Sequence, residues 1–186
     1  MSERGDLRLF VAIYPPPDAA RDMLRALAKL DLPPDARHKV TRLDQLHMTV
    51  QFIGDVPGRD LDDVVESVER SAAGVTPFTL TPHRLVTLPE RGTPRLIAVE
   101  TDLPAGLVEV HRRLAQRFSR TLRTDSADRF FPHITVCRFT GAAKPASVDA
   151  TVVLLPFSVS KLTLVRSTLS PAGAKHEAVQ DVRFTG

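Results

Sequence analysis

The feature that most constrains this chain is a tetrapeptide that occurs twice. His47–Val50 reads HMTV and His133–Val136 reads HITV, and the two copies begin 86 residues apart in a chain of 186. A separation close to half of the sequence is typical of a protein built from two related halves. The repeat therefore predicts a fold in which each half carries one copy of the tetrapeptide in a similar structural position.

Both copies lie in segments rich in branched apolar residues, which favour β-strands. Side chains alternate between the two faces of a strand, so the histidine and threonine of each copy share one face and the two apolar residues take the other. The apolar face can enter a core, which leaves the imidazole and the hydroxyl on the opposite face. If an approximate two-fold axis relates the halves, both His–Thr pairs converge on one central cleft.

The remaining sequence predicts an α+β fold with largely antiparallel pairing, because strands and helices do not alternate regularly. We predict strands at 7–14, 46–53, 77–88, 95–100, 131–139, 157–169 and 176–184. Helices are predicted at about 18–30 with Asp18 as N-cap, after an N-cap at Asp60, and at about 104–123. Loops are predicted at 32–39 and 141–147, and Gly54 is predicted to end the second strand.

Composition excludes several classes of protein. No segment approaches eighteen consecutive apolar residues, so no membrane span is expected, and the opening MSERGDLRLF lacks the pattern of a secretory signal, which predicts a cytoplasmic location. The single cysteine, Cys137, excludes an intrachain disulfide and is interpreted as a buried residue of an apolar run. The formal net charge of +3 weakly favours a polyanionic partner such as RNA.

Two facing imidazoles with adjacent hydroxyls suit the cleavage of a phosphodiester. An ordinary histidine pKa of ~6.5 allows one ring to be neutral and the other protonated near neutral pH. The neutral ring can accept a proton from water while the protonated ring donates one to the departing oxygen. Each threonine hydroxyl can donate to a non-bridging phosphate oxygen and stabilise developing charge without a metal ion. The symmetry of the repeat leaves the acid and base roles interchangeable on these grounds.

The segments around the motifs resemble a known family. The chain is similar to 2H phosphoesterases of the LigT-like branch, the RNA 2′,3′-cyclic phosphodiesterases that are also called 2′-5′ RNA ligases. The matching segments occur in the expected order and spacing, and they are RLFVAIYPP, LHMTVQFIGDV, PFTLT, RFFPHITVCRF and LTLVRSTLSPAG. The resemblance implies that residues 1–186 form a single α+β domain with two pseudo-symmetric lobes, one motif in each (47–50 and 133–136). Antiparallel sheets would line a central cleft, with helices outside.

The resemblance also implies an activity. Enzymes of this branch hydrolyse a terminal 2′,3′-cyclic phosphate to a 2′-phosphate, and some relatives join RNA ends through a 2′-5′ linkage in the reverse direction. The expected partners are RNA ends or nucleotides that carry a cyclic phosphate. No cofactor, metal ion or membrane is expected, and the protein is expected to be a monomer in the cytoplasm.

Carried over to this sequence, the family pattern gives roles to individual residues. His47 would be the general acid that protonates the 3′ oxygen, and His133 would be the general base that activates water. Thr49 and Thr135 would hold the phosphate oxygens. Arg138 matches an arginine that commonly follows the second motif and would add positive charge to the phosphate site.

Three features qualify this pattern. Plain alternation puts Arg138 on the core side of its strand, so either the strand twists or bulges after Cys137, or Arg138 has a structural role. Phe131 shares the face of His133 and is a candidate for base stacking or for the core. His176 stands where relatives commonly have a tyrosine and is a candidate for substrate contact or an exposed strand residue, while the tryptophan that relatives often carry ahead of the first motif is absent.

Other functions stay open. A 2H phosphoesterase for a different cyclic or 2′-5′-linked nucleotide, such as ADP-ribose 1″,2″-cyclic phosphate or an oligoadenylate, fits the same motifs. A module that binds nucleotides or RNA without turnover is a second alternative, although it has no need of two titrating groups. A metallohydrolase is disfavoured, because no Cys, Asp or Glu is spaced with either motif to complete a metal site.

Overall fold

The computed structural model describes residues 5–33, 36–118, 130–140, 147–170 and 173–186. A nine-stranded sheet runs through this part of the chain in the order β11-β10-β1-β3-β7-β6-β5-β8, with β2 paired to β7. The strands are β1 (Leu7–Ile13), β2 (His38–Val40), β3 (Met48–Val56), β5 (Pro82–Leu88), β6 (Leu96–Thr101), β7 (His133–Phe139), β8 (Asp149–Thr151), β10 (Lys161–Ser170) and β11 (Gly173–Arg183). Every described pairing is antiparallel, which confirms the predicted fold class.

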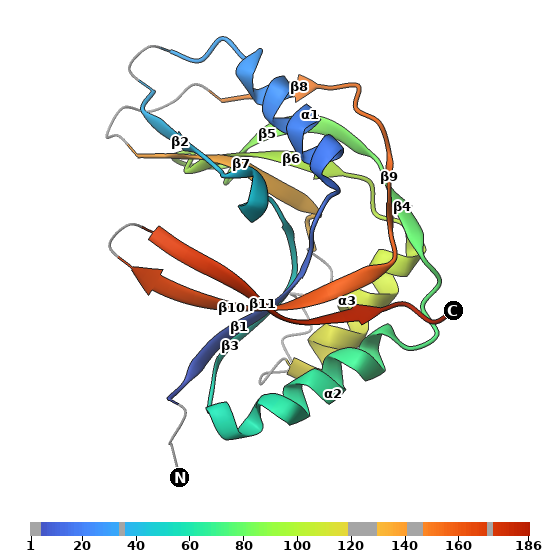
Figure 1. Cartoon of the computed structure of the whole chain (residues 1–186). Coiled ribbons are helices and arrows are strands. Elements are labelled where there is room, and N and C mark those ends of the chain that lie inside the picture. Colours follow the sequence, from blue (N-terminus) through green and yellow to red (C-terminus); the bar gives the residue numbers. More distant parts are fainter. Residues whose placement is uncertain (1–4, 34–35, 119–129, 141–146, 171–172) are drawn as a thin grey trace.

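The sheet is narrowest at its centre. There β3 and β7 meet through one pair of Cα partners, Met48 and Ile134. On one side β1, β3, β10 and β11 form what we term the first arm; on the other, β2, β5, β6, β7 and β8 form the second arm. Figure 1 shows the arms diverging from this junction, and we term the sides that face each other the inner face.

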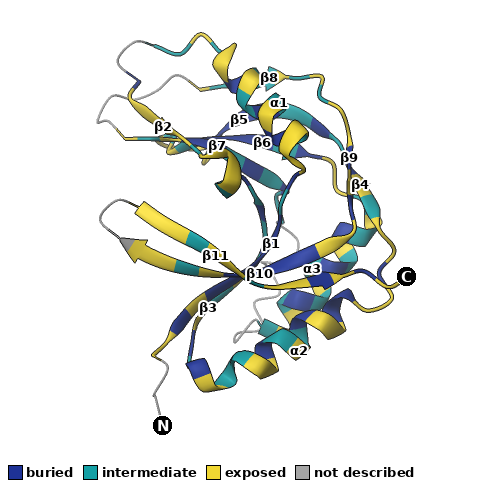
Figure 2. Ribbon diagram, in the orientation of Figure 1, coloured by how far each residue is buried: buried dark blue, intermediate teal, exposed yellow. Residues whose placement is uncertain are grey.

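Three α-helices are described, and they pack on the outer sides of the arms (Figure 1). Helices α2 (Leu61–Ala72) and α3 (Ala105–Phe118) pack against the first arm, and α1 (Pro17–Ala28) contacts the second arm at β7. Each helix buries one apolar stripe, as Figure 2 shows, and these stripes join the outer faces of the strands in one main core. No described helix is long and apolar enough to cross a membrane.

A smaller apolar cluster lies on the inner face of the first arm. Strand β1 is buried on both sides: its odd-numbered residues enter the main core, while Phe10 and Ala12 pack with Val165 of β10 beneath Tyr14. The predicted strand at 7–14 is therefore confirmed, ending one residue earlier than expected. Part of the candidate site packs against this second apolar cluster.

Two predicted strands are each divided. Residues 77–88 form β4 (Phe78–Leu80) and β5, and residues 157–169 form β9 (Phe157–Val159) and β10; β4 and β9 pair with each other in a separate two-stranded sheet. The first division falls at Thr81, whose N–H donates to the carboxylate of Asp102 over 2.7 Å instead of to a neighbouring strand. Local apolar pattern does not reveal such a change of partner.

Two short strands were missed. Strand β2 lies partly within the predicted loop at 32–39, and β8 lies at the far edge of the second arm. Strand β3 also continues to Val56, so Gly54 does not end it; with φ of 92°, Gly54 lies instead at an irregularity in the pairing with β1. Each of these features depends on the neighbouring strand and not on local propensity.

The helix starts also needed correction. Helix α1 begins at Pro17, so Asp18 is not the N-cap; it lies in the first turn and pairs with Arg21 at 2.5 Å. Asp60 does occupy the N-cap position of α2, but its side chain forms no capping hydrogen bond. Helix α3 is described as far as Phe118, and its predicted end at 119–123 lies outside the described residues.

Candidate active site

The two tetrapeptides are adjacent at the junction of the arms. Met48 and Ile134 are Cα partners and both are fully buried. Extending this antiparallel register by one residue places each histidine opposite the threonine of the other motif. The half-buried His47, Thr49, His133 and Thr135 therefore gather on the inner face, as the strand alternation predicts.

The two histidine rings are held in the same way. Nδ1 of His47 donates to the carbonyl of Gln45 over 2.7 Å, and Nδ1 of His133 donates to the carbonyl of Phe131 over 2.8 Å. A carbonyl oxygen only accepts, so these bonds assign the neutral rings a proton on Nδ1 and a free lone pair on Nε2. Each ring thus presents to the inner face the nitrogen that can take up or release a proton.

A bulge at the last residue of each motif changes the strand alternation. In β3 the partners of Ala12 and Val11 are Thr49 and Gln51, so Val50 is the extra residue. In β7 the partners of Ala98 and Ile97 are Thr135 and Cys137, so the extra residue is the valine of the second motif. After each bulge the alternation restarts, and the residue five positions beyond the histidine returns to the inner face.

Those two residues are Arg138 and Phe52. Arg138 is exposed, and its charge lowers the pKa of both His47 and His176. The strand therefore bulges, as one of the two expectations for Arg138 required, but the bulge lies at Val136 and not after Cys137. Phe52 has 68% of its surface exposed. Sequence reasoning missed Phe52, although its offset from the first histidine equals that of Arg138 from the second.

The hairpin β10–β11 brings a third histidine to the site. The ring centroid of His176 lies 5.1 Å from that of His47, with the rings nearly perpendicular, and 5.0 Å from that of Phe10. His176 is half-buried and not an exposed strand residue. Phe131, the remaining candidate, is half-buried with its ring centroid 5.7 Å from that of His133.

Tyr14 completes the inner face near the first motif. Its ring centroid lies 5.6 Å from that of His47. Burial, followed by the charges of Asp181 and Asp44, raises the pKa of the Tyr14 hydroxyl, so this group remains a neutral hydrogen-bond donor at physiological pH. Sequence reasoning missed Tyr14, since it lies far from both motifs along the chain.

The electrostatics of the inner face favour a neutral ring at His47 and at His176. Burial lowers the pKa of His47 to about 4, against an opposing contribution from its hydrogen bond to Gln45, and the charges of His176, Arg138 and His133 lower it further. Burial and then Arg138 also lower the pKa of His176. An anion bound among these groups would offset the cationic contributions and favour protonation.

The other histidines lie outside this arrangement. His111 donates through Nδ1 to the carbonyl of Val50 over 2.8 Å and stacks on Phe130, while Nε2 of His83 lies 3.8 Å from Glu100. Cys137 is fully buried, as predicted, and burial raises the pKa of its thiol. Among the described residues, no group of three or more His, Cys, Asp and Glu is placed to hold a metal ion.

A pocket of about 470 Å³ lies elsewhere, between α1 and residues 151–155. Its lining includes Asp22, Arg25 and Lys29 but no histidine. The cluster of histidines, threonines and Arg138 has the groups that phosphate chemistry needs, whereas this pocket lacks a nucleophile–base pair. We therefore take the inner face at the arm junction as the candidate site.

Comparison with known proteins identifies the family. Residues 14–171 match the 2′-5′ RNA ligase superfamily, and the chain belongs to it. An RNA 2′,3′-cyclic phosphodiesterase from Thermus thermophilus is 27% identical over 190 residues, which cover 97% of this chain and 91% of that protein. Another, from Aquifex aeolicus, is 23% identical over 76% of this chain and 79% of that protein.

Solved structures support the same fold. The crystal structure of TT0787 from Thermus thermophilus matches with a TM-score of 0.78 and 27% identity, covering 96% of this chain and 98% of that one. Escherichia coli LigT complexed with 3′-AMP matches with a TM-score of 0.73 and 23% identity, covering 97% and 99% of the two chains. The 2H phosphoesterase architecture expected from the sequence is thus present.

Proposed function

We propose that this protein is an RNA 2′,3′-cyclic phosphodiesterase that uses His47 and His133 as an acid–base pair. The observation that carries the proposal is the matched presentation of two Nε2 atoms from adjacent strands, each fixed by an Nδ1–H bond to a backbone carbonyl. The similar proteins from Thermus thermophilus and Aquifex aeolicus bear the same activity in their names.

In the proposed reaction each histidine transfers one proton. Water attacks the cyclic phosphorus as His133 Nε2 accepts one of its protons, and the new P–O bond forms as the P–O3′ bond breaks. The departing 3′ oxygen takes a proton from His47 Nε2, which leaves a 3′-hydroxyl and a 2′-phosphate. After the product leaves, proton exchange with solvent returns both histidines to their starting states.

The acid role requires His47 to be protonated when substrate is bound. Its pKa of about 4 in the free protein means that the ring is neutral near pH 7. The cyclic phosphate carries a negative charge, which offsets the neighbouring cations and raises this pKa. Substrate binding is therefore coupled to uptake of a proton by His47, and the proton that is taken up is the one later given to the 3′ oxygen.

Thr49, Thr135 and Arg138 supply the remaining contacts to the phosphate. The two hydroxyls lie beside the histidines on the inner face and can each donate to a non-bridging oxygen. The guanidinium of Arg138 can donate two parallel bonds to the same group, and its charge stabilises the additional negative charge of the transition state.

Two phenylalanines are proposed to contact the terminal base. The ring of Phe52 lies 6.1 Å from that of Phe10, which contacts His47, so it borders the phosphate site while remaining accessible. Phe131 borders the site on the side of His133. Aromatic stacking is tolerant of base identity, which suits an enzyme that acts on RNA ends of varied sequence.

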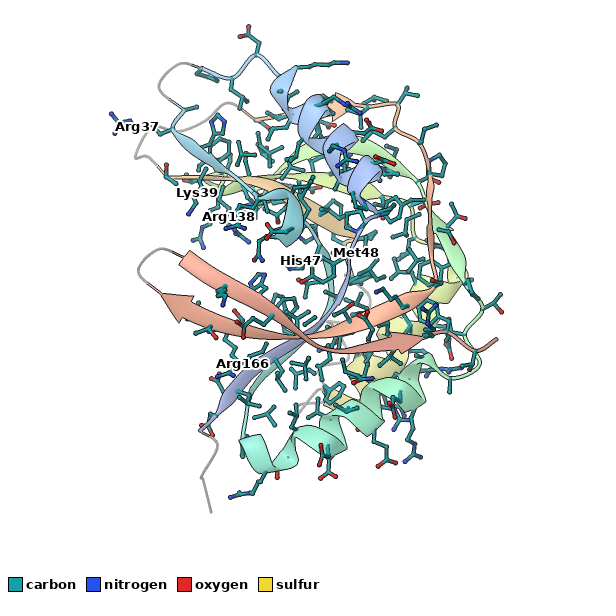
Figure 3. The ribbon with its side chains drawn as sticks, viewed as in Figure 1. Arg37, Lys39, His47, Met48, Arg138 and Arg166 are labelled. Atoms are coloured by element: carbon teal, nitrogen blue, oxygen red, sulfur yellow. The ribbon has the colours of Figure 1, made fainter. Side chains whose placement is uncertain are left out.

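A row of cations extends from the phosphate site along β2, and it favours an RNA end over a mononucleotide. Lys39 is the Cα partner of Arg138, and Arg37 lies two residues before Lys39, just ahead of β2 (Figure 3). All three side chains are exposed. Exposed cations beside the phosphate site suit binding of the phosphates upstream of the RNA end.

The activity is tested by incubating the purified protein with an oligoribonucleotide ending in a 2′,3′-cyclic phosphate, in the presence of EDTA. The expected product is a 2′-phosphate end. A 3′-phosphate product would contradict the assigned acid, and loss of activity in EDTA would favour a metal-dependent reaction. Turnover confined to another cyclic or 2′-5′-linked nucleotide would keep the mechanism and change the substrate.

The proposal extends to the whole chain. We take residues 1–186 as a single domain of two lobes with one motif in each, because the main core includes residues of both arms. It is also part of the proposal that the protein acts as a monomer in the cytoplasm, since both histidines come from the same chain.

A further inference from the structure

The hairpin β10–β11 places His176 beside the proposed acid, at a position that the reaction described above does not use. His176 is the Cα partner of Ser167, and alternation along β11 turns its side chain to the inner face. Its ring contacts His47 and Phe10 at centroid distances of 5.1 and 5.0 Å. The ring is thus next to the phosphate site and is fixed by aromatic contacts on two sides.

The two nitrogens of His176 differ in their surroundings. Nδ1 is buried and has no hydrogen-bond partner within the described part of the chain. An unpaired N–H is costly to bury, whereas an unpaired acceptor is better tolerated, so the ring proton belongs on Nε2. This is the opposite tautomer to that of His47 and His133, whose Nδ1 atoms donate to backbone carbonyls.

Protonation of His176 is disfavoured for the same reason. A second proton would create a buried, unpaired N–H at Nδ1, and the nearby charged groups offer no compensation. The groups that face it are His47, just before β3, and Arg138 from β7, with Arg8 of β1 in the same row of the sheet. Within the described residues no carboxylate forms an ion pair with the ring, and its pKa is lowered by burial and by Arg138.

We propose that His176 is a neutral hydrogen-bond donor, through Nε2–H, to an oxygen of the phosphate held between His47 and His133. The inference rests on the proposed function and adds a residue to it. A neutral donor stabilises phosphate charge without adding a cation beside His47, which must itself be protonated to act as the acid. A tyrosine hydroxyl at this position would satisfy the same requirement.

Three variants separate this role from packing and from acid–base catalysis. His176→Gln keeps an N–H donor near the position of Nε2, His176→Tyr supplies a hydroxyl, and His176→Phe keeps the ring without a donor. His176→Phe should lower kcat for the cyclic phosphate roughly 10- to 100-fold with little change in KM, as expected for a donor to a charged group. His176→Gln and His176→Tyr should remain within about a few-fold of the original protein, the scale of a retained donor. His83→Phe is the matched control, with no expected effect.

Two outcomes would overturn the proposal. If His176→Phe were as active as the original protein, His176 would have only a packing role. Loss of one limb of the pH–rate profile in His176→Gln would make His176 an acid or base instead of a donor. Thermal unfolding of each variant shows whether a loss of rate reflects loss of fold.

A measurement that needs no turnover keeps the inference separate from the proposed function. Nitrogen-15 NMR of labelled histidine should show the Nε2–H tautomer for His176 and the Nδ1–H tautomer for the two motif histidines. Titration with inorganic phosphate should shift the His176 Nε2 resonance without changing its tautomer. An Nδ1–H or doubly protonated ring at neutral pH would refute the proposal, whether or not a cyclic phosphate is hydrolysed.

Discussion

Anion binding at the arm junction should depend strongly on pH, because His47 must gain a proton. Its pKa is about 4 in the free protein and 6.5 in its ordinary environment. If a bound anion restores the ordinary value, the pKa rises by about 2.5, and anion affinity should rise about 30-fold between pH 7.5 and pH 5. A group whose pKa is higher in the complex than in the free protein takes up a proton on binding, so a lower pH favours the complex.

Sulfate is the suitable ligand, because its charge is constant over this pH range. Isothermal titration calorimetry at pH 5, 6 and 7.5 gives the affinity, and repeating each titration in buffers of different ionisation enthalpy gives the number of protons taken up. His47→Gln should bind sulfate with a much weaker pH dependence. Equal affinity at all three pH values, or the same pH dependence in His47→Gln, would refute the reasoning.

Three further predictions concern base stacking, the cation row and stability. Phe52→Ala should lower kcat/KM roughly 5- to 100-fold and Phe52→Tyr should restore it, the range for one stacked base; an unaffected Phe52→Ala would exclude stacking. Lys39→Ala should weaken the binding of an oligoribonucleotide and reduce the salt dependence of that binding, but it should leave the affinity for a cyclic mononucleotide unchanged. Arg166→Ala is the control, because Arg166 lies on the outer face. The unfolded chain binds a proton at His47 more readily than the folded one, so stability should fall as pH drops from about 6.5 to about 4, by up to about 3 kcal/mol. Urea unfolding of the original protein and of His47→Gln at several pH values measures this loss of stability. An equal dependence of the unfolding free energy on pH in the two proteins would contradict the prediction.

The core of the candidate site was predictable because it depends on local pattern. The two-residue period of a strand places His47 with Thr49 and His133 with Thr135, and the structure keeps all four on the inner face. The likeness of the two halves predicted that the motifs would converge. Burial of Cys137 followed in the same way from its apolar neighbours.

The rest of the site depends on pairing between distant segments. Simple alternation failed for Arg138, because the extra residue at Val136 is defined only by its partners in β6. The equivalent bulge at Val50 brings Phe52 to the inner face, and no local signal reveals it. His176 reaches His47 only because β10 and β11 form a long hairpin beside β1.

The edges of the sheet were hardest to predict for a related reason. Strands β2 and β8 have only three residues each and are stabilised by a single neighbouring strand. Their sequences include charged residues that are typical of loops, which is how edge strands limit unwanted association. The exposed Lys39 of β2 was therefore assigned to a loop, and the cation row went unnoticed.

Single-turnover kinetics of His47→Ala, His133→Ala and the double variant test the central claim most directly. Each single variant should lower the rate of opening of a 2′,3′-cyclic phosphate roughly 10²- to 10⁴-fold, the range for a general acid or base. Because the two histidines act in one concerted step, the double variant should lose little more than the slower single variant. Undiminished rates in both single variants would contradict the two-histidine mechanism.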